Sequence, residues 1–133
     1  MRWLSFRIFH QDAEKLGTRF AVRESQAVES IPFSGVLPVS GSADALLGTL
    51  NYRGKSVRVF DLGAALGLGS GYLPQRVRLL MVRLTRTSLP MAIAVQPELE
   101  EVPGEEAGDL KVVDLRLLSR IRVTPPRVEQ VNP

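Results

Sequence analysis

Short stretches in which apolar and polar residues alternate recur along the chain. The clearest are residues 3–9, 18–22, 49–52, 56–59, 76–84, 89–95 and 110–113. A side-chain period of two gives each strand one apolar face for a core and one polar face for water. Many short strands with closely spaced turn signals are typical of small β-barrels. The pattern therefore predicts an all-β fold, mainly strands with short helices.

The best-defined stretch, residues 47–68, reads as a hairpin followed by a capped helix. The tripeptide Arg53-Gly54-Lys55 forms the turn, and its glycine can adopt a positive φ at little cost. Asp61 is placed to cap the free amides of a helix over residues 62–66, and Gly67 is placed to end it. Nothing here resembles a catalytic motif, so the stretch predicts a binding surface on a rigid hairpin.

The segments between these strands are less regular. Loops or turns are predicted over residues 10–17, 39–45, 69–74 and 85–88. Residues 23–30 are ambiguous, because Ser25 could cap one helical turn while residues 28–31 could form a short strand. Prolines bracket residues 33–37, which favours an extended edge segment over a central strand.

The C-terminal third combines acidic, helical and proline-rich segments. Residues 96–109 contain two prolines and two glycines, so they are predicted to form an acidic loop with at most one helical turn. Asp114 is predicted to cap a helix that ends near Arg120. Residues 122–133 have no packing period and are predicted to be an extended or disordered tail, which leaves residues 1–121 as the domain.

A strand, an aspartate and a short helix follow one another twice, over residues 59–66 and 112–118. We interpret the chain as two similar β units, each closed by a short helix. The alternative is that this transition is simply a common one.

The positive charge is unevenly distributed. The net charge is +3, but six of the 14 acidic residues lie between Glu98 and Asp109, and the rest of the chain carries 17 basic against eight acidic residues. Fourteen of the basic residues are arginines, which suit paired contacts with carboxylates or phosphates. This fits an acidic partner surface, a nucleic acid or simply a solvated surface, and we favour the solvated surface for most of the arginines.

The residue types needed for most enzyme chemistry are missing. There is no cysteine, which excludes disulfides and thiolate sites and fits a reducing cytoplasm. His10, the sole histidine, lies beside a predicted loop without a triad motif. Residues 98–106 lack calcium-loop spacing, and residues 67–71 lack the lysine of a phosphate-binding loop. We therefore expect no enzymatic activity, metal, cofactor or small-molecule substrate.

The chain has no apolar run of about 18 residues that could span a membrane. Charged residues interrupt its start too early for a secretory signal, so we expect a cytoplasmic protein. RNA binding by a small barrel would need exposed aromatic side chains among basic ones. Tyr52 beside Arg53 is the one suggestive pair, because the other aromatics mostly fall on apolar strand faces. Nucleic acid is therefore not the expected partner.

The hairpin resembles the signature of the CheW family of chemotaxis coupling proteins. The matching residues are Leu46-Leu47-Gly48-Thr49-Leu50-Asn51-Tyr52-Arg53-Gly54-Lys55, followed by Val57-Arg58-Val59-Phe60-Asp61-Leu62. The family signature has a glycine, an asparagine and an Arg-Gly pair in the first part and an Asp-Leu step in the second. The resemblance covers about residues 4–118 and is most specific over residues 28–68.

The resemblance implies two small, intertwined SH3-like five-stranded β-barrel subdomains that share a hydrophobic interface. It implies a non-catalytic adaptor that couples the cytoplasmic tips of methyl-accepting chemoreceptors to a CheA-type histidine kinase, in chemotaxis or pilus motility. Arg53 matches an arginine used in this coupling, and Gly48, Val28 and Ile31 match positions that line the receptor-facing groove. The partner-binding residues implied are Val28, Ser30, Ile31, Gly48, Asn51, Arg53 and Gly54.

Three features depart from the family pattern. The family often has a glutamate at the position of Ser30, so Glu29 or Glu24 would have to pair with Arg53, or Arg53 would be free. Arg58 stands where a proline is common. Residues 96–109 are shorter than the family segment that carries an additional strand. The second barrel is therefore expected to be trimmed, or completed through self-association with a second copy.

Two other functions stay open from the sequence. One is a diverged CheW-like domain that binds another signalling protein, such as a pilus regulator. The other is a small-barrel RNA-binding protein. Weakly salt-dependent binding to the kinase alone would favour the adaptor.

Overall fold

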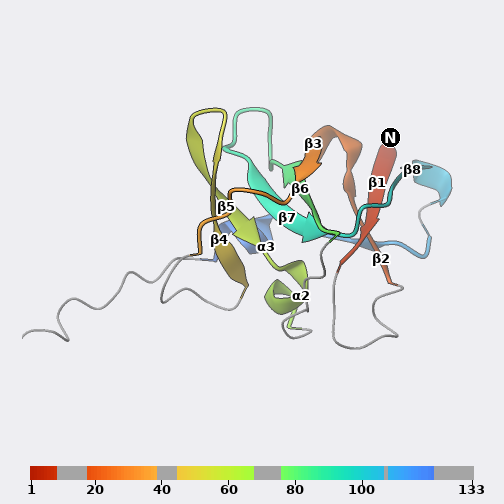
Figure 1. The fold of residues 1–133 in the computed structure, drawn as a ribbon. Helices are drawn as coiled ribbons and strands as arrows, with labels where there is room; N and C mark the ends of the chain where they lie inside the picture. The colour runs from red at the N-terminus through yellow and green to blue at the C-terminus, as the bar shows by residue number, and fades with distance from the viewer. Residues whose placement is uncertain (9–17, 39–44, 68–75, 107, 122–133) are drawn as a thin grey trace, which may run out of the picture.

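A computed structural model describes residues 1–8, 18–38, 45–67, 76–106 and 108–121, and it shows two β-sheets with short helices (Figure 1). The elements in chain order are β1 (Arg2–Arg7), β2 (Arg19–Arg23), η1 (Glu24–Gln26), β3 (Ala27–Pro32), β4 (Leu46–Tyr52), β5 (Lys55–Phe60), α2 (Leu62–Ala65), β6 (Arg78–Val82), β7 (Met91–Val95), β8 (Leu99–Pro103), η2 (Gly104–Glu106), β9 (Lys111–Val112) and α3 (Arg116–Ser119). The all-β prediction is confirmed. His10, most of the predicted loops and the predicted tail over 122–133 lie outside the described residues.

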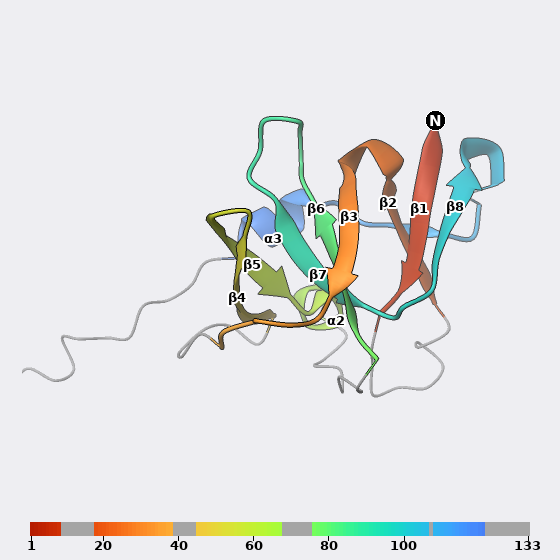
Figure 2. The same cartoon turned by 45° about the horizontal axis from the view of Figure 1, so that its top comes forward.

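The two sheets are not consecutive halves of the chain. The five-stranded sheet has the order β3-β6-β7-β5-β4, and the four-stranded sheet has the order β8-β1-β2-β9. The smaller sheet therefore draws its strands from both ends of the described chain, as Figure 2 shows. The two similar β units of the interpretation therefore do not correspond to the two halves of the chain, because strands far apart in sequence pair within one sheet. The smaller sheet also has four described strands instead of the five implied.

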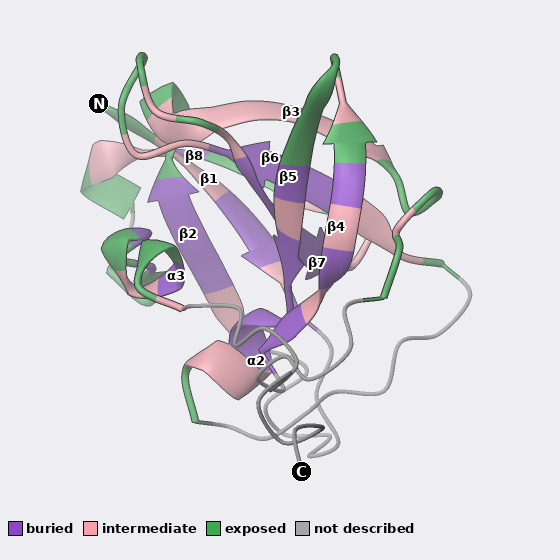
Figure 3. Ribbon diagram, turned by 90° about the vertical axis from the view of Figure 1, so that its left-hand side faces the viewer, coloured by how far each residue is buried: buried purple, intermediate pink, exposed green. Residues whose placement is uncertain are grey.

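The buried residues form three clusters: one is shared by the two sheets, and each sheet also has a cluster of its own. The shared core contains Phe6, Phe20, Leu80, Ile93 and Leu118, which come from both sheets and from α3. A second cluster belongs to the five-stranded sheet, and a small third cluster to the four-stranded sheet. Every residue of β7 is buried (Figure 3), because its alternate side chains enter the shared core and the second cluster. The hydrophobic interface implied by the resemblance is therefore present.

Both short helices pack into the shared core. Leu62 of α2 and Leu118 of α3 are fully buried there, so neither helix closes a separate unit. The predicted start of α2 is confirmed, because the Asp61 carboxylate accepts a hydrogen bond from the Ala64 amide at 3.3 Å. The prediction for α3 was partly wrong: Asp114 accepts from the Arg116 amide at 3.0 Å, but Leu115 occupies the N-cap.

The acidic segment contains a strand that the sequence analysis did not predict. Strand β8 pairs antiparallel with β1 along five residues, and Val102 is buried against the third cluster. Its carboxylates meet arginines, since Arg2 contacts Glu101 at 3.2 Å and Arg19 contacts Glu100 at 3.1 Å. Backbone pairing with β1 and these ion pairs offset the weak strand propensity of the segment. The expected lack of a strand here was therefore wrong.

The chain that leaves β3 joins the two edges of the five-stranded sheet. Leu37 and Thr49 exchange two backbone hydrogen bonds of 2.8 and 2.9 Å, an isolated bridge at the end of the segment predicted to be extended, whereas Gly35 within that segment has φ +74°. Gly48 lies next to this bridge. A Cβ atom added to Gly48 would stand 2.2 Å from the Leu37 carbonyl oxygen. Glycine is thus required here because two backbones approach closely.

We expect Gly48→Ala to lower the free energy of unfolding by about 1–3 kcal/mol, because the added methyl group overlaps the Leu37 backbone. Urea unfolding followed by circular dichroism measures the change. Gly108→Ala is the matched control, since no atom lies within 4 Å of its added Cβ, and it should change stability by less than about 0.5 kcal/mol. Equal stabilities for the two variants would contradict this role of Gly48.

Candidate functional site

The pairing of the five-stranded sheet brings three separate segments to one end of the molecule. Strands β5 and β7 are parallel neighbours, so the turns that precede them lie at the same end of the strands. Strand β3 runs antiparallel to β6, with Ala27 opposite Val82, so the start of β3 lies at this same end of the strands. The β4–β5 turn, the β6–β7 connection and the start of β3 therefore meet, although up to about 60 residues separate them in the sequence.

The β4–β5 turn fixes the direction of the motif arginine. Arg53 has φ +50° and Gly54 has φ +81°, a combination typical of a two-residue type I′ hairpin turn. No atom lies within 4 Å of a Cβ added to Gly54, so the positive φ, not lack of space, requires the glycine. For Arg53 the left-handed conformation costs about 1–2 kcal/mol, which the register of the flanking strands must offset. The hairpin predicted here is confirmed.

Glu29 holds the tip of this hairpin. One carboxylate oxygen, Oε2, accepts a hydrogen bond of 2.6 Å from the Tyr52 hydroxyl and a second from Arg53 Nη2. The Arg53 guanidinium also lies 5.0 Å from the centre of the Tyr52 ring, within range of a cation–π interaction. The two charged side chains are 70% and 36% exposed, so the ion pair stabilises the fold by at most about 1 kcal/mol. Its main effect is to orient Arg53.

Glu29 and Glu24 were the two acids proposed to pair with Arg53 in place of a glutamate at position 30, and Glu29 is the one that pairs with it. A bulge between Ala27 and Glu29 shifts the register of β3 by one residue, and such bulges redirect side chains. Ser30 instead accepts a hydrogen bond of 3.0 Å from Arg78 Nε. Glu24 pairs with Arg2 at 3.4 Å.

Burial and Glu29 both act on the tyrosine. Burial raises the pKa of Tyr52, and the hydrogen bond and negative charge of Glu29 raise it further, whereas the positive charge of Arg53 lowers it. The Tyr52 hydroxyl therefore keeps its proton and remains a donor to Glu29.

The cleft beside this hairpin, here called the hairpin cleft, has a volume of about 270 Å³. Its walls are Tyr52, Arg53 and Lys55 from the hairpin, Val28 from β3, and Arg83 with residues 86–90 from the β6–β7 connection. Four of these side chains are cationic. The cleft can attract anionic groups, and it contains no pair of residues arranged for proton transfer.

The predicted partner-binding residues fall into two groups. Val28 and Arg53 line the hairpin cleft, and Asn51 and Gly54 are exposed on the hairpin beside it. Ser30, Ile31 and Gly48 do not line the cleft. Ile31 packs against the core of the five-stranded sheet, while Ser30 and Gly48 make the contacts with Arg78 and Leu37 described above.

Sequence analysis missed Arg83, Arg86 and Leu89 as residues near the motif. Arg86 belongs to the predicted turn, and Arg83 and Leu89 lie near the end and at the start of the predicted strands on either side of it. The parallel pairing of β5 with β7 puts them beside Arg53, and no local signal in the sequence reveals that pairing.

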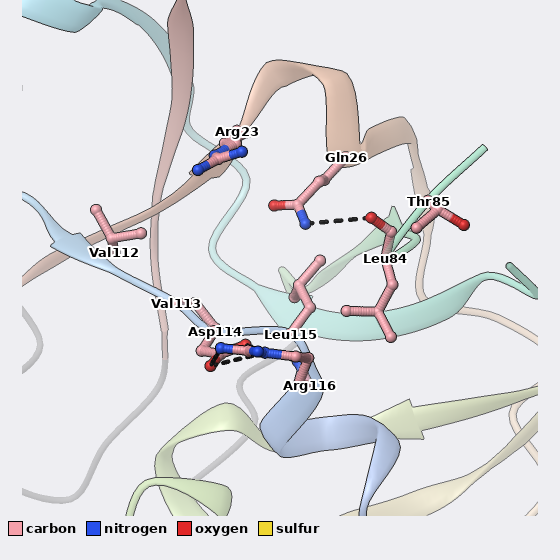
Figure 4. Close-up of a pocket in the computed structure, with 9 residues that line it drawn as sticks. All are labelled: Arg23, Gln26, Leu84, Thr85, Val112, Val113, Asp114, Leu115 and Arg116. Atoms are coloured by element: carbon pink, nitrogen blue, oxygen red, sulfur yellow. Dashed lines mark hydrogen bonds and ion pairs between the residues drawn. The ribbon is translucent and has the colours of Figure 1, made fainter.

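A larger cleft of about 510 Å³, the inter-sheet cleft, lies where β2, the end of β6 and the start of α3 converge (Figure 4). Gln26 Nε2 donates to the Leu84 carbonyl at 3.4 Å on one side, and Asp114 pairs with Arg116 at 2.9 Å on the other. The hydrogen bond from the Arg116 side chain, followed by that from its backbone amide, lowers the pKa of Asp114. These polar groups satisfy one another, so the cleft offers few free groups to a ligand.

Two kinds of feature are absent from the described part of the chain. Within it, no group of three or more histidine, cysteine, aspartate or glutamate residues could hold a metal ion. No helix among the same residues has the length and apolar character to cross a membrane.

Comparisons with known proteins point to one family. Residues 8–111 match the family model described as CheW-like domain. The fold is similar to the crystal structure of the scaffolding protein TtCheW from Thermoanaerobacter tengcongensis, with a TM-score of 0.62 and 15% sequence identity. That similarity covers 83% of this chain and 65% of that one, so the chain spans slightly less than two-thirds of the length of TtCheW. No curated protein matched the sequence.

We expect Glu29→Gln to lower the pKa of Tyr52, because the substitution removes the negative charge beside its hydroxyl. Burial, the largest single cause of the shift, remains in this variant and still raises the pKa. Carbon NMR of the tyrosine ring through a pH titration measures it. Glu100→Gln, which removes a carboxylate on β8, is the control and should leave this pKa unchanged. An unaltered pKa in Glu29→Gln would contradict the contact.

Proposed function

The chain belongs to the CheW-like domain family, and we propose that it is a signalling adaptor that couples chemoreceptors to a CheA-type histidine kinase. Proteins of this family are non-catalytic scaffolds, which agrees with the lack of catalytic groupings in the hairpin cleft and the inter-sheet cleft. On this proposal the protein acts in the cytoplasm, where it binds the receptor tips and the kinase. Residues 1–121 are the proposed adaptor domain, and we propose that residues 122–133 do not belong to it.

The observation that carries this proposal is the contact of Glu29 with Tyr52 and Arg53 on a type I′ turn. A binding module needs a surface held in one conformation, because each side chain that is ordered on association adds an entropic cost. The Arg53 guanidinium is held by one carboxylate and one ring yet remains 70% exposed. It is therefore oriented before a partner arrives and still accessible to it.

The predicted site residues take two proposed roles. Val28, Asn51, Arg53 and Gly54 lie at the surface of the hairpin or its cleft, and we assign them to direct contact with a partner. Ser30, Ile31 and Gly48 are assigned to positioning, through pairing of β3 with β6 and through the close approach to Leu37.

A strand donated by a second copy is not required for the smaller sheet, because β8 and β9 already flank β1 and β2. The RNA-binding alternative gains little support from the fold. Phe6, Phe20 and Phe60 are buried, and the Tyr52 ring interacts with Arg53. Base stacking needs free aromatic faces. The coupling role is therefore the one we put forward.

We expect Arg53→Ala to weaken binding to the receptor fragment or the kinase about 10-fold or more, as for a central arginine in an interface. Isothermal titration calorimetry with each purified partner measures the affinities, and circular dichroism checks the fold. Arg120→Ala removes an exposed arginine at the end of α3 and is the control, with affinities expected to stay within about 2-fold. A folded Arg53→Ala protein that binds both partners normally and still couples them would refute the role of Arg53.

A further inference from the structure

Four cationic side chains line the hairpin cleft, and no carboxylate lines it among the described residues. Arg53, Lys55, Arg83 and Arg86 all line it. In the part of the chain that the structure describes, Arg53 alone of these four has a carboxylate partner, Glu29. Like charges held in a small cleft raise the local positive potential and attract anions.

Arg83 is incompletely satisfied. Its Nη1 donates to the Arg86 carbonyl at a distance of 3.5 Å, the long limit of a hydrogen bond. Its Nε is buried and has no hydrogen-bond partner among the described residues. A guanidinium in this state gains more from a carboxylate than one already paired, because its desolvation is only partly compensated.

The turn that carries Arg86 is held by its own hydrogen bonds. The Ser88 amide donates to the Thr85 carbonyl at 3.2 Å, and the Thr85 and Ser88 hydroxyls lie 2.8 Å apart. The positive groups on this side of the cleft are therefore presented from an ordered turn, as Arg53 is on the other side.

An apolar side chain lies among these charges. Leu89 is 63% exposed, and the partly buried Val28 and Pro90 line the cleft beside it. A partner that supplied carboxylates alone would leave Leu89 in water, whereas an apolar residue between carboxylates would cover it.

We propose that the hairpin cleft receives an acidic segment of a partner protein, with at least two carboxylates for Lys55, Arg83 and Arg86 and one apolar side chain against Leu89. This inference rests on the proposed function, since the segment belongs to one of the proteins that the adaptor couples. It goes beyond that function by assigning the β6–β7 connection to the interface and by stating the chemistry that the interface recognises.

Amide proton–nitrogen NMR of the full chain tests the cleft directly. The probe is a capped synthetic peptide of sequence Glu-Glu-Leu-Glu-Glu, with Gln-Gln-Leu-Gln-Gln and Glu-Glu-Ser-Glu-Glu as controls. We expect shifts at Lys55, Arg86 and Leu89 with the first peptide. The serine peptide should bind about 3-fold more weakly and the glutamine peptide about 10-fold more weakly. Added salt should weaken the acidic peptides most, because their binding depends on unscreened charge.

Matched variants locate the effect. Arg86→Glu should weaken the binding of the Glu-Glu-Leu-Glu-Glu peptide about 10-fold, because one attraction becomes a repulsion. Arg23→Glu makes the same charge change at the inter-sheet cleft and should have less than about 2-fold effect. Equal losses in the two variants, equal binding of the acidic and glutamine peptides, or no shift at the cleft would overturn the inference. A single-stranded RNA that binds this cleft more tightly than the peptide would also overturn it.

The same variants, titrated with the receptor fragment and the kinase, separate the two proposals. If the acidic peptide does not bind while both proteins bind and are coupled, the acidic specificity of the cleft is refuted and the coupling function is not. If the peptide binds as expected and neither protein binds, the coupling function is refuted and the acidic specificity of the cleft is supported.

Discussion

The shared hydrophobic core between the two sheets is the constraint on which the rest of the structure depends. Side chains from β1, β2, β6 and β7 meet there, and Leu62 and Leu118 add α2 and α3 to the same cluster. Because β6 and β7 are covered on both faces, they form a fixed centre to which the edge strands attach. The strands on either side of each turn are fixed by this packing. A small protein can therefore present exposed side chains in defined directions.

The candidate site follows from how strands are arranged around that centre. The parallel pairing of β5 with β7 puts two turns side by side, and Glu29, which follows the bulge in β3, contacts Arg53. The result is a surface with little burial of its own and oriented charge. Such a surface contributes little to stability and much to recognition, which is what the proposed adaptor role requires.

The sequence predicted local features well because local chemistry determines them. The Arg53–Gly54 turn, the Asp61 cap and the alternation of β4 and β5 depend on neighbouring residues. Strand β8 was missed because its pairing with β1 and its ion pairs to Arg2 and Arg19 involve residues about 80 or more positions away. The hairpin cleft was missed for the same reason, since Arg83 and Arg86 reach Arg53 only through the order of strands in the sheet.

The proposed function requires this chain to connect a receptor physically to a kinase. Co-sedimentation of the purified kinase with receptor-containing membranes, with and without the chain, measures that connection directly. We expect the kinase to sediment with the membranes only when the chain is present, in proportion to the amount of chain added. Equal sedimentation of the kinase without the chain, or no sedimentation with it, would contradict the proposed coupling function.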